Sequence, residues 1–362
     1  MQNSSLVRSF APGWFASVMG TAVAVIALQV FRSYIPFVDV LQFFFLGLAF
    51  LMFVLALVPW TLRWFLHPDA ALTDLRNPVS GAFFPTMPIS LLVGGIALEK
   101  VGPRFLPEAV LPPLLQGLWL LGAAGILVFA VVILNNFFHH PEMKWETATL
   151  GWLIPPVSAL LVPVLGSSLA NTFAGTFWGE LNLIVSLAFL GFGGLLFLFV
   201  MAVAFNRYIF HPLPAAHLAP TLWIGLAPSS ILAVGLIRIV APLGKFLGAE
   251  DAAVQTLSLL AGGMGVALWG FAFFWLILTL AVTLSVHNKT RIPFALSWWA
   301  FVFPMGAFVV ASGVVFQAVP SGLILWTGLA ALLGYFVLWA WVFALTLRGL
   351  GNGSLLQPHT AK

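Results

Sequence analysis

Long apolar runs separated by short polar segments dominate the sequence. Each run is bounded by charges, prolines or clusters of polar residues. A helix that crosses the hydrocarbon core of a bilayer needs about 20 apolar residues, and every run is about that long or longer. The pattern therefore predicts ten transmembrane helices, at about 11–31, 37–65, 81–99, 112–136, 150–169, 178–206, 221–240, 253–286, 295–314 and 322–347.

Odd-numbered and even-numbered runs differ in character. The even-numbered runs are long and largely uninterrupted, whereas the odd-numbered ones contain proline together with glycine, serine and threonine. When Val18, Pro85, Pro155, Pro228 and Pro304 are taken as equivalent, their spacings are 67, 70, 73 and 76 residues. This period predicts an all-α integral membrane protein, a single domain over 1–362, built from five helix-hairpin repeats at about 11–65, 81–136, 150–206, 221–286 and 295–347.

The prolines and small residues of the odd-numbered runs are the candidate lining of a pore. Proline removes a backbone donor and frees carbonyl groups that hydrocarbon cannot satisfy, so such breaks are tolerated where protein or water meets them. We therefore expect the odd-numbered helices to surround a central pore and the even-numbered ones to face lipid. The alternative is that small residues only serve helix packing. The predicted lining residues are Ser17, Gly20, Thr21, Pro85, Thr86, Pro155, Ser158, Pro228, Ser229, Pro304 and Gly306.

Two phenylalanines are the candidate gate of this pore. The residues just before the five breaks are Ser17, Phe84, Ile154, Ala227 and Phe303, which form one layer if the repeats are in register. An apolar ring in a narrow path excludes water and blocks hydrated ions until it moves aside. The plain alternative is that Phe84 and Phe303 are ordinary core aromatics among 35 phenylalanines.

Charge is scarce, and its distribution orients the chain. Only 7% of the 362 residues are charged and 62% are hydrophobic, which excludes a soluble protein. With the N-terminus inside, nine Lys or Arg residues fall on inner segments and four on outer loops, so both termini are expected in the cytoplasm, in a multi-pass protein of the plasma or inner membrane. No charged residue lies near the middle of a run, although Glu180 and Arg238 lie towards the predicted outer face. We therefore expect facilitated diffusion and no buried proton relay.

The same sequence offers no cofactor site. It contains no cysteine, which excludes thiolate metal sites, and its seven histidines all fall outside the predicted helices, which disfavours a membrane-embedded haem or metal. We expect no metal and no cofactor. The net charge of +4 follows the topology and gives no support to nucleic-acid binding.

Several motifs, taken in order, resemble one transporter family. They are Phe10-Ala11-Pro12-Gly13-Trp14-Phe15 and Val18-Met19-Gly20-Thr21 in the first helix, Asn77-Pro78 ahead of Phe84-Pro85, Pro155 with Gly166-Ser167-Ser168, Leu226-Ala227-Pro228, and Ser297-Trp298-Trp299-Ala300-Phe301-Val302-Phe303-Pro304-Met305-Gly306. Over about 10–345 the chain is similar to the tellurite-resistance/dicarboxylate transporter family. That family includes fungal malate and sulfite permeases and the slow anion channels of plant guard cells.

This resemblance implies a function. Family likeness implies a pore of five tilted hairpins in a homotrimer with one pore per subunit, conducting small anions and plugged by an aromatic ring of the ninth helix, which would be Phe303 here. The substrate expected first is a C4-dicarboxylate such as malate; sulfite, chloride, nitrate or a tellurite-related anion are the alternatives. An integral membrane transferase is a remote alternative, because the inner-loop histidines and carboxylates show no metal-ligand spacing and no nucleophile motif. We expect no enzyme.

Overall fold

The computed structural model describes residues 6–141 and 143–355, and this part of the chain is helical without any β-strand. It contains ten helical segments long and apolar enough to cross a membrane, which confirms the predicted fold class. The segments are Pro12–Val30, Val38–Leu66, Gly81–Arg104, Leu111–Phe138, Leu150–Thr172, Phe177–Phe210, Ala216–Leu247, Asp251–Thr290, Leu296–Ala318 and Gly322–Gly351.

The seventh segment departs most from its predicted bounds. The sequence predicts an end near residue 240, but the helix continues to Leu247. Arg238 and Lys245 interrupt the apolar pattern there without ending the helix. Arg238 therefore lies within the span and not at its end.

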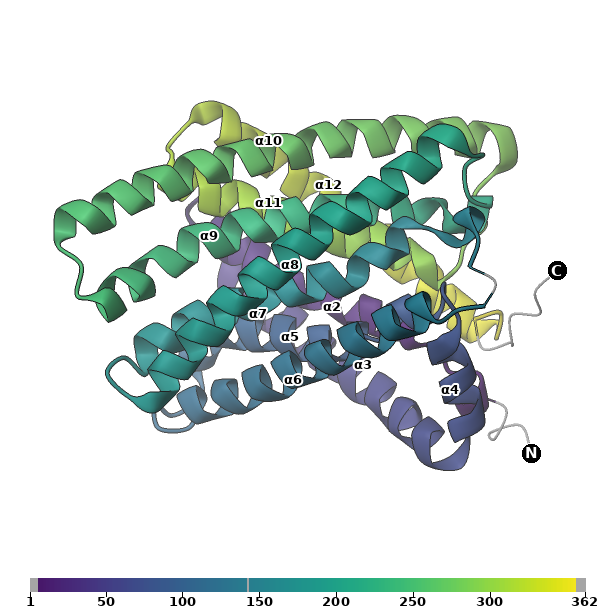
Figure 1. The fold of residues 1–362 in the computed structure, drawn as a ribbon, viewed down its shortest axis with the longest axis horizontal. Coiled ribbons are helices and arrows are strands. Elements are labelled where there is room, and N and C mark those ends of the chain that lie inside the picture. Colours follow the sequence, from purple (N-terminus) through teal and green to yellow (C-terminus); the bar gives the residue numbers. More distant parts are fainter. Residues whose placement is uncertain (1–5, 142, 356–362) are drawn as a thin grey trace.

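Consecutive helices pack as five antiparallel pairs (Figure 1). In each pair a shorter helix is followed by a longer one, and the long partner is on the outside of the bundle. The pairs are α2 (Phe15–Val30) with α3 (Val38–Leu66), α5 (Thr86–Val101) with α6 (Leu111–Phe138), α7 (Ile154–Thr172) with α8 (Phe177–Phe210), α9 (Leu226–Leu247) with α10 (Asp251–Thr290), and α11 (Trp299–Ala318) with α12 (Gly322–Gly351).

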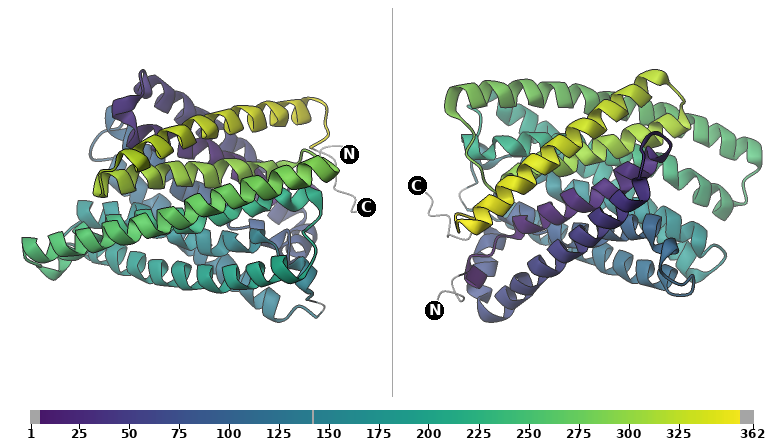
Figure 2. Two further views of the ribbon diagram at one scale, coloured as in Figure 1. Left: turned by 90° about the horizontal axis from the view of Figure 1, so that it is seen from above. Right: turned by 180° about the vertical axis from the view of Figure 1, so that it is seen from behind.

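The five shorter helices form a closed inner ring. Along the chain each contacts the next, from α2 to α5, α7, α9 and α11, and α11 contacts α2 again. Between 72% and 94% of the most apolar stretch of these spans is buried, against 22–33% for the five outer helices. The outer helices, which flank the bundle in the two further views (Figure 2), expose large apolar side chains such as Phe50, Phe199, Phe274 and Trp326. Lipid is the environment that suits such a surface.

Aromatic hydrogen bonds tie the outer helices to the inner ring. Trp119 Nε1 of α6 donates to the Val162 carbonyl of α7 at 2.9 Å, and Tyr335 Oη of α12 donates to the Gly20 carbonyl of α2 at 2.6 Å. Trp269 of α10 donates to Ser312 Oγ at 2.8 Å. Because a polar group without a partner is costly in a bilayer, these bonds fix how each outer helix is rotated.

All five inner helices begin at the same end of the bundle, where both described ends of the chain also lie (Figures 1 and 2). We name this end the terminus face and the opposite end the far face. Arg63, which is only 2% exposed, fastens the loops of the terminus face. Its guanidinium donates to the Phe10 carbonyl at 2.8 Å and to Asp74 Oδ2 of the short helix α4 (Pro68–Arg76) at 2.5 Å. The segment that leads into α2 is thereby held in place.

Candidate functional site

A 3₁₀ segment precedes each of the five inner helices. A short 3₁₀ segment runs directly into four of them and, before α5, ends two residues short of the helix. Pro85 is the N-cap of α5, and Pro155 and Pro228 lie in the first turns of α7 and α9, where the missing N–H costs no intrahelical bond. The 3₁₀ segments are Pro12–Trp14, Gly81–Phe83, Leu150–Leu153, Ala216–Gly225 and Leu296–Trp298.

This corrects the prediction of matched proline breaks inside the odd-numbered spans. Of the prolines aligned from the sequence, only Pro304 lies in a helix interior, at the sixth residue of α11. There it removes the hydrogen bond that a residue at 304 would donate to the Ala300 carbonyl. The other three mark helix starts.

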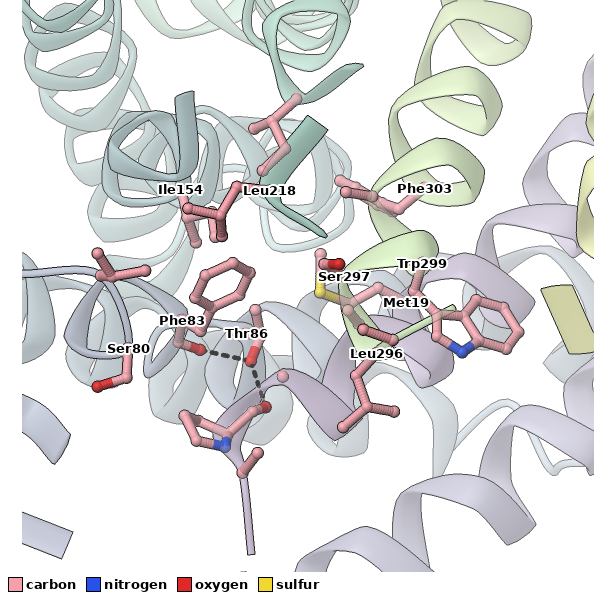
Figure 3. A pocket seen from close by; sticks show the side chains of 18 of the residues that line it. Met19, Ser80, Phe83, Thr86, Ile154, Leu218, Leu296, Ser297, Trp299 and Phe303 are labelled. Atoms are coloured by element: carbon pink, nitrogen blue, oxygen red, sulfur yellow. Dashed lines mark hydrogen bonds between the residues drawn. The ribbon is translucent and has the colours of Figure 1, made fainter. Parts of the chain in front are cut away.

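A cavity of about 510 Å³ lies where the five helix starts converge; we call it the wide cavity. Its walls come from all five inner helices and the segments before them. Figure 3 shows side chains of Met19, Phe83, Thr86, Ile154, Leu218 and Phe303 around one common space. Polar residues, Asn77, Ser80, His217 and Ser297, lie on the lining segments that precede α5, α9 and α11. No Lys, Arg, Asp or Glu lines it among the described residues.

A second cavity continues along the axis towards the far face. This narrow cavity has a volume of only about 30 Å³, and its lining is aliphatic apart from one aromatic ring. That ring is Phe303, which lines both cavities and is 5% exposed. Phe303 therefore stands at the junction between the wide and the narrow cavity. The other residues of the narrow cavity are Val23, Ile26, Val93, Ile96, Leu161, Val164, Ile231, Val234, Ala307 and Val310.

The linings of the two cavities show which residues of the five inner spans lie at the same level. Each inner span contributes residues at i, i+3, i+7 and i+10, the spacing of one face of an α-helix, although Ile224 lies in the 3₁₀ segment before α9. The Phe303 layer is Met19, Ile89, Val157, Ala227 and Phe303, with spacings of 70, 68, 70 and 76 residues. The layer nearer the terminus face is Ala16, Thr86, Ile154, Ile224 and Ala300, and the two beyond Phe303 hold the ten aliphatic residues of the narrow cavity.

Three of the predicted site residues line the axis and ten do not. Phe303, Thr86 and Pro304 line the wide cavity. The others lie outside both cavities: Ser17, Gly20, Thr21, Phe84, Pro85, Pro155, Ser158, Pro228, Ser229 and Gly306. In the predicted layer, Ile154, Ala227 and Phe303 do face the axis, but Ile154 belongs to a different layer from the other two.

Phe84 packs away from the axis. It is fully buried, and its ring centroid lies 5.2 Å from that of Trp60, 6.0 Å from that of Trp64 and 5.8 Å from that of Phe129. The adjacent Phe83 faces the wide cavity instead. The pairing of Phe84 with Phe303 across a pore is therefore corrected, because the 3₁₀ turn before α5 places the preceding residue on the axis.

Four of the five predicted hydroxyl groups already donate to backbone carbonyls, whereas the buried Ser229 hydroxyl has no hydrogen-bond partner among the described residues. Ser17 and Ser158 donate to carbonyls three residues earlier, at 2.7 and 2.5 Å. Thr21 donates to the Ser17 carbonyl and accepts from Trp339 Nε1 of α12 at 3.1 Å. Thr86 lines the wide cavity, yet its hydroxyl bonds the Phe83 and Pro12 carbonyls (Figure 3).

The predicted glycines are contact points between helices. A Cβ added at Gly20 would lie 2.9 Å from Trp299 of α11, and one at Gly306 would overlap Val23 Cγ1 of α2. These two glycines allow α2 and α11 to approach closely and close the ring. The packing role that the sequence left open as an alternative is what the structure assigns to both.

The field at the wide cavity comes from backbone rather than from charged side chains. Five helix N-termini surround it, and each carries a partial positive charge of about half an elementary charge. An anion is the ligand that such an arrangement favours. Within residues 6–141 and 143–355, no three His, Asp or Glu side chains are grouped as metal ligands would be.

A comparison with known families matches this architecture to one family over almost the whole chain. The sequence model of the voltage-dependent anion channel (SLAC1) family matches residues 9–347. The chain belongs to this family. The resemblance noted from the sequence motifs is thereby confirmed.

Three relatives of the chain are transporters by name. The chain is 33% identical to an uncharacterized transporter of Methanocaldococcus jannaschii, over 98% of this chain and 97% of the relative. It is 24% identical to a sulfite efflux pump of Trichophyton rubrum, covering 94% and 90% of the two chains. It is 23% identical to a putative malic acid transport protein of Schizosaccharomyces pombe, covering 99% and 84%. The family is one of anion transporters.

Proposed function

We propose that this protein is a membrane pore through which small anions cross by facilitated diffusion along the axis of the inner ring. The observation that carries the proposal is the position of Phe303, the residue shared by the wide and the narrow cavity. This ring lies between a space of molecular size and the narrow aliphatic cavity that follows it towards the far face.

The anion preference follows from the ends of the inner helices. The wide cavity has no charged lining, so its potential is set by the five helix N-termini and the polar residues near them. A weak positive field of this kind attracts an anion without holding it, which conduction requires.

We propose that the permeating species carries a single negative charge. The free energy of dehydrating an ion rises with the square of its charge, and no cationic side chain offsets that cost at the wide cavity. Hydrogen sulfite, nitrate and chloride suit this lining. C4-dicarboxylates such as malate, the substrates expected first from the sequence, become the second candidate; one relative is named a putative malic acid transport protein.

We propose Phe303 as the gate. Its ring stands between the cavities, and Pro304 removes a backbone hydrogen bond in the same turn. A helix lacking that bond bends more easily. A small movement of α11 then suffices to shift the ring off the axis, whereas the narrow aliphatic path stays dry while the ring is in place.

The test is the flux of nitrate, chloride, sulfite and malate into liposomes containing purified protein. Replacing Phe303 by alanine should raise the flux about tenfold or more and preserve anion preference in reversal potentials, because it removes a steric barrier and leaves the helix ends unchanged. Phe84→Ala is the matched control: it deletes an equally buried ring off the axis and should leave flux unchanged. Folded Phe303→Ala protein with unaltered flux would contradict the gate, and wild-type protein that carries no anion would contradict the pore.

We further propose that the terminus face is cytoplasmic and that the protein is a homotrimer in the cell membrane. The first follows the excess of Lys and Arg on the segments of that face, and the second rests on family likeness. Single cysteines placed in this cysteine-free chain, at Arg76 and at Glu108, should be labelled from opposite sides of the membrane. Native mass spectrometry in mild detergent should give a trimer; a monomer alone would refute that assembly.

A further inference from the structure

One helical turn beyond the narrow cavity, the axial face of the inner ring changes character. The last aliphatic layer contains Ile96, Val164 and Val234. Adding one turn of four residues to each chain position of that layer gives the next layer towards the far face. Its members are Val30, Lys100, Ser168, Arg238 and Val314. Two of the five are cations, in a ring that otherwise carries no charge on its axial face.

Glu99 connects this layer across two helices. Its Oε2 lies 2.7 Å from Lys100 Nζ, and its Oε1 accepts a hydrogen bond from Ser168 Oγ of α7. The side chains of Glu99 and Lys100 are 15% and 23% exposed, so the pair is largely shielded from solvent. Lys100 therefore has a partner within the protein.

Arg238 differs, because no carboxylate holds it. Among the described residues, none lies within 4.0 Å of its guanidinium, and no hydrogen bond to it is found. Glu99 acts on it only through longer-range attraction. Since α9 continues nine residues past Arg238, this partly buried cation lies within the span. An ionisable side chain without a partner inside a membrane-spanning helix indicates a functional site.

The direction of the inner helices supplies a reason for cations here. All five end towards the far face, where their C-termini carry partial negative charge. An anion that has passed the narrow cavity would be repelled by this end of the ring. Lys100 lies in the last turn of α5, and Arg238 belongs to the layer that contains the last residue of α2, so the two cations offset that repulsion.

We propose that Arg238, assisted by Lys100, forms an anion-binding site at the far end of the axis, for a small oxyanion such as nitrate or hydrogen sulfite. The guanidinium presents paired N–H donors to two oxygens of the ligand. Glu99 occupies Lys100 and so keeps the net charge of the site low, which lets the ligand leave. This inference rests on the proposed function, because it completes the same path.

The first test uses nitrate flux into liposomes with nitrate supplied at the far face. The Arg238→Cys variant should raise the half-saturating nitrate concentration about tenfold, and a trimethylammonium thiosulfonate reagent should restore it, because the chain has no other cysteine. Arg32→Cys is the matched control: Arg32 is also an arginine near the far face, but Asp39 already binds it at 2.8 and 2.9 Å. Arg32→Cys should leave the half-saturating nitrate concentration unchanged, with or without the reagent.

The Glu99→Gln variant should change the half-saturating nitrate concentration in the opposite direction. Without the carboxylate, Lys100 is released towards the ligand, so the half-saturating concentration should fall and the maximal flux should fall with it. Wild-type nitrate flux together with unchanged saturation in both Arg238→Cys and Arg238→Gln would overturn the site and leave the pore standing.

A binding measurement separates the site from the pore. Nitrate should slow the labelling of Ser168→Cys by an anionic thiosulfonate reagent, and this protection should vanish when Arg238→Gln is added. Protection without any flux would support the site and overturn the proposed function. Equal protection in both backgrounds, or none in either, would overturn the site.

Discussion

The two faces of each inner helix have opposite chemistry. The axial face is aliphatic at i, i+3, i+7 and i+10, apart from Phe303 and a few residues near the terminus face. The face towards neighbouring helices carries the hydroxyls and glycines: Thr21 and Ser312 accept hydrogen bonds from tryptophans of outer helices, and Gly306 lies in close contact with α2 and α12. Small and polar residues in these spans therefore mark contacts between helices, while branched aliphatic residues mark the walls of the narrow cavity.

The largest effect should come from the packing face. Gly306→Val places side-chain atoms where Val23 and Tyr335 already lie, so α11 cannot approach α2 and the ring cannot close. We expect no monodisperse folded protein in fluorescence-detected size exclusion. Gly270→Val is the control, because a Cβ at Gly270 of α10 meets nothing within 4 Å. Normal folding of Gly306→Val would show that the two faces do not differ in this way.

A smaller effect, on flux, should come from the axial face. Leu161→Ala together with Ile231→Ala widens the layer next to Phe303. In a Phe303→Ala background these changes should raise anion flux several-fold more, because the ring and the aliphatic layer are barriers in series. Leu160→Ala is the control, since Leu160 is equally buried but packs against Gly193 of α8. An equal rise in the control would mean that loosened packing, not the axis, governs flux.

The smallest effect should come from a single hydrogen bond on the packing face. Thr21→Val deprives Trp339 Nε1 of its acceptor and should lower the free energy of unfolding by about 1–3 kcal/mol while leaving flux unchanged. Adding Trp339→Phe should then cost less than it does alone, which a double-mutant cycle of unfolding measures. If Thr21→Val lowered the flux without changing the stability, Thr21 would have to face the axis.

The spans were predictable because a bilayer imposes a length. Nine of the ten segments begin and end near their predicted bounds, because the apolar runs and the charged loops between them can be recognised in the sequence. The exception is the segment that ends at Leu247: Arg238 and Lys245 predict an end near residue 240, but the helix continues past both. A span that surrounds an axis can contain a cation that a lipid-facing span cannot, and composition alone does not separate the two.

The axial register was not predictable from prolines. Proline is free to occupy any position of a first turn, so Pro85, Pro155 and Pro228 lie at different distances from the Phe303 layer. The inner helices are buried on all sides and carry only small, weakly polar residues among the apolar ones, which hides the face that the usual periodicity would reveal. Aligning the five spans on Met19 and Phe303, and then comparing positions i, i+3, i+7 and i+10 in each, would identify the residues that face the axis.

The ring around the axis is built by one chain, and this has a consequence for its symmetry. Five identical subunits would place five copies of the same side chain in every layer. Here the layer of Phe303 contains methionine, isoleucine, valine and alanine at its four other positions, so a single aromatic ring meets four smaller or more flexible neighbours. The proposed gate therefore requires one ring to move, where five identical subunits would require five rings to move together.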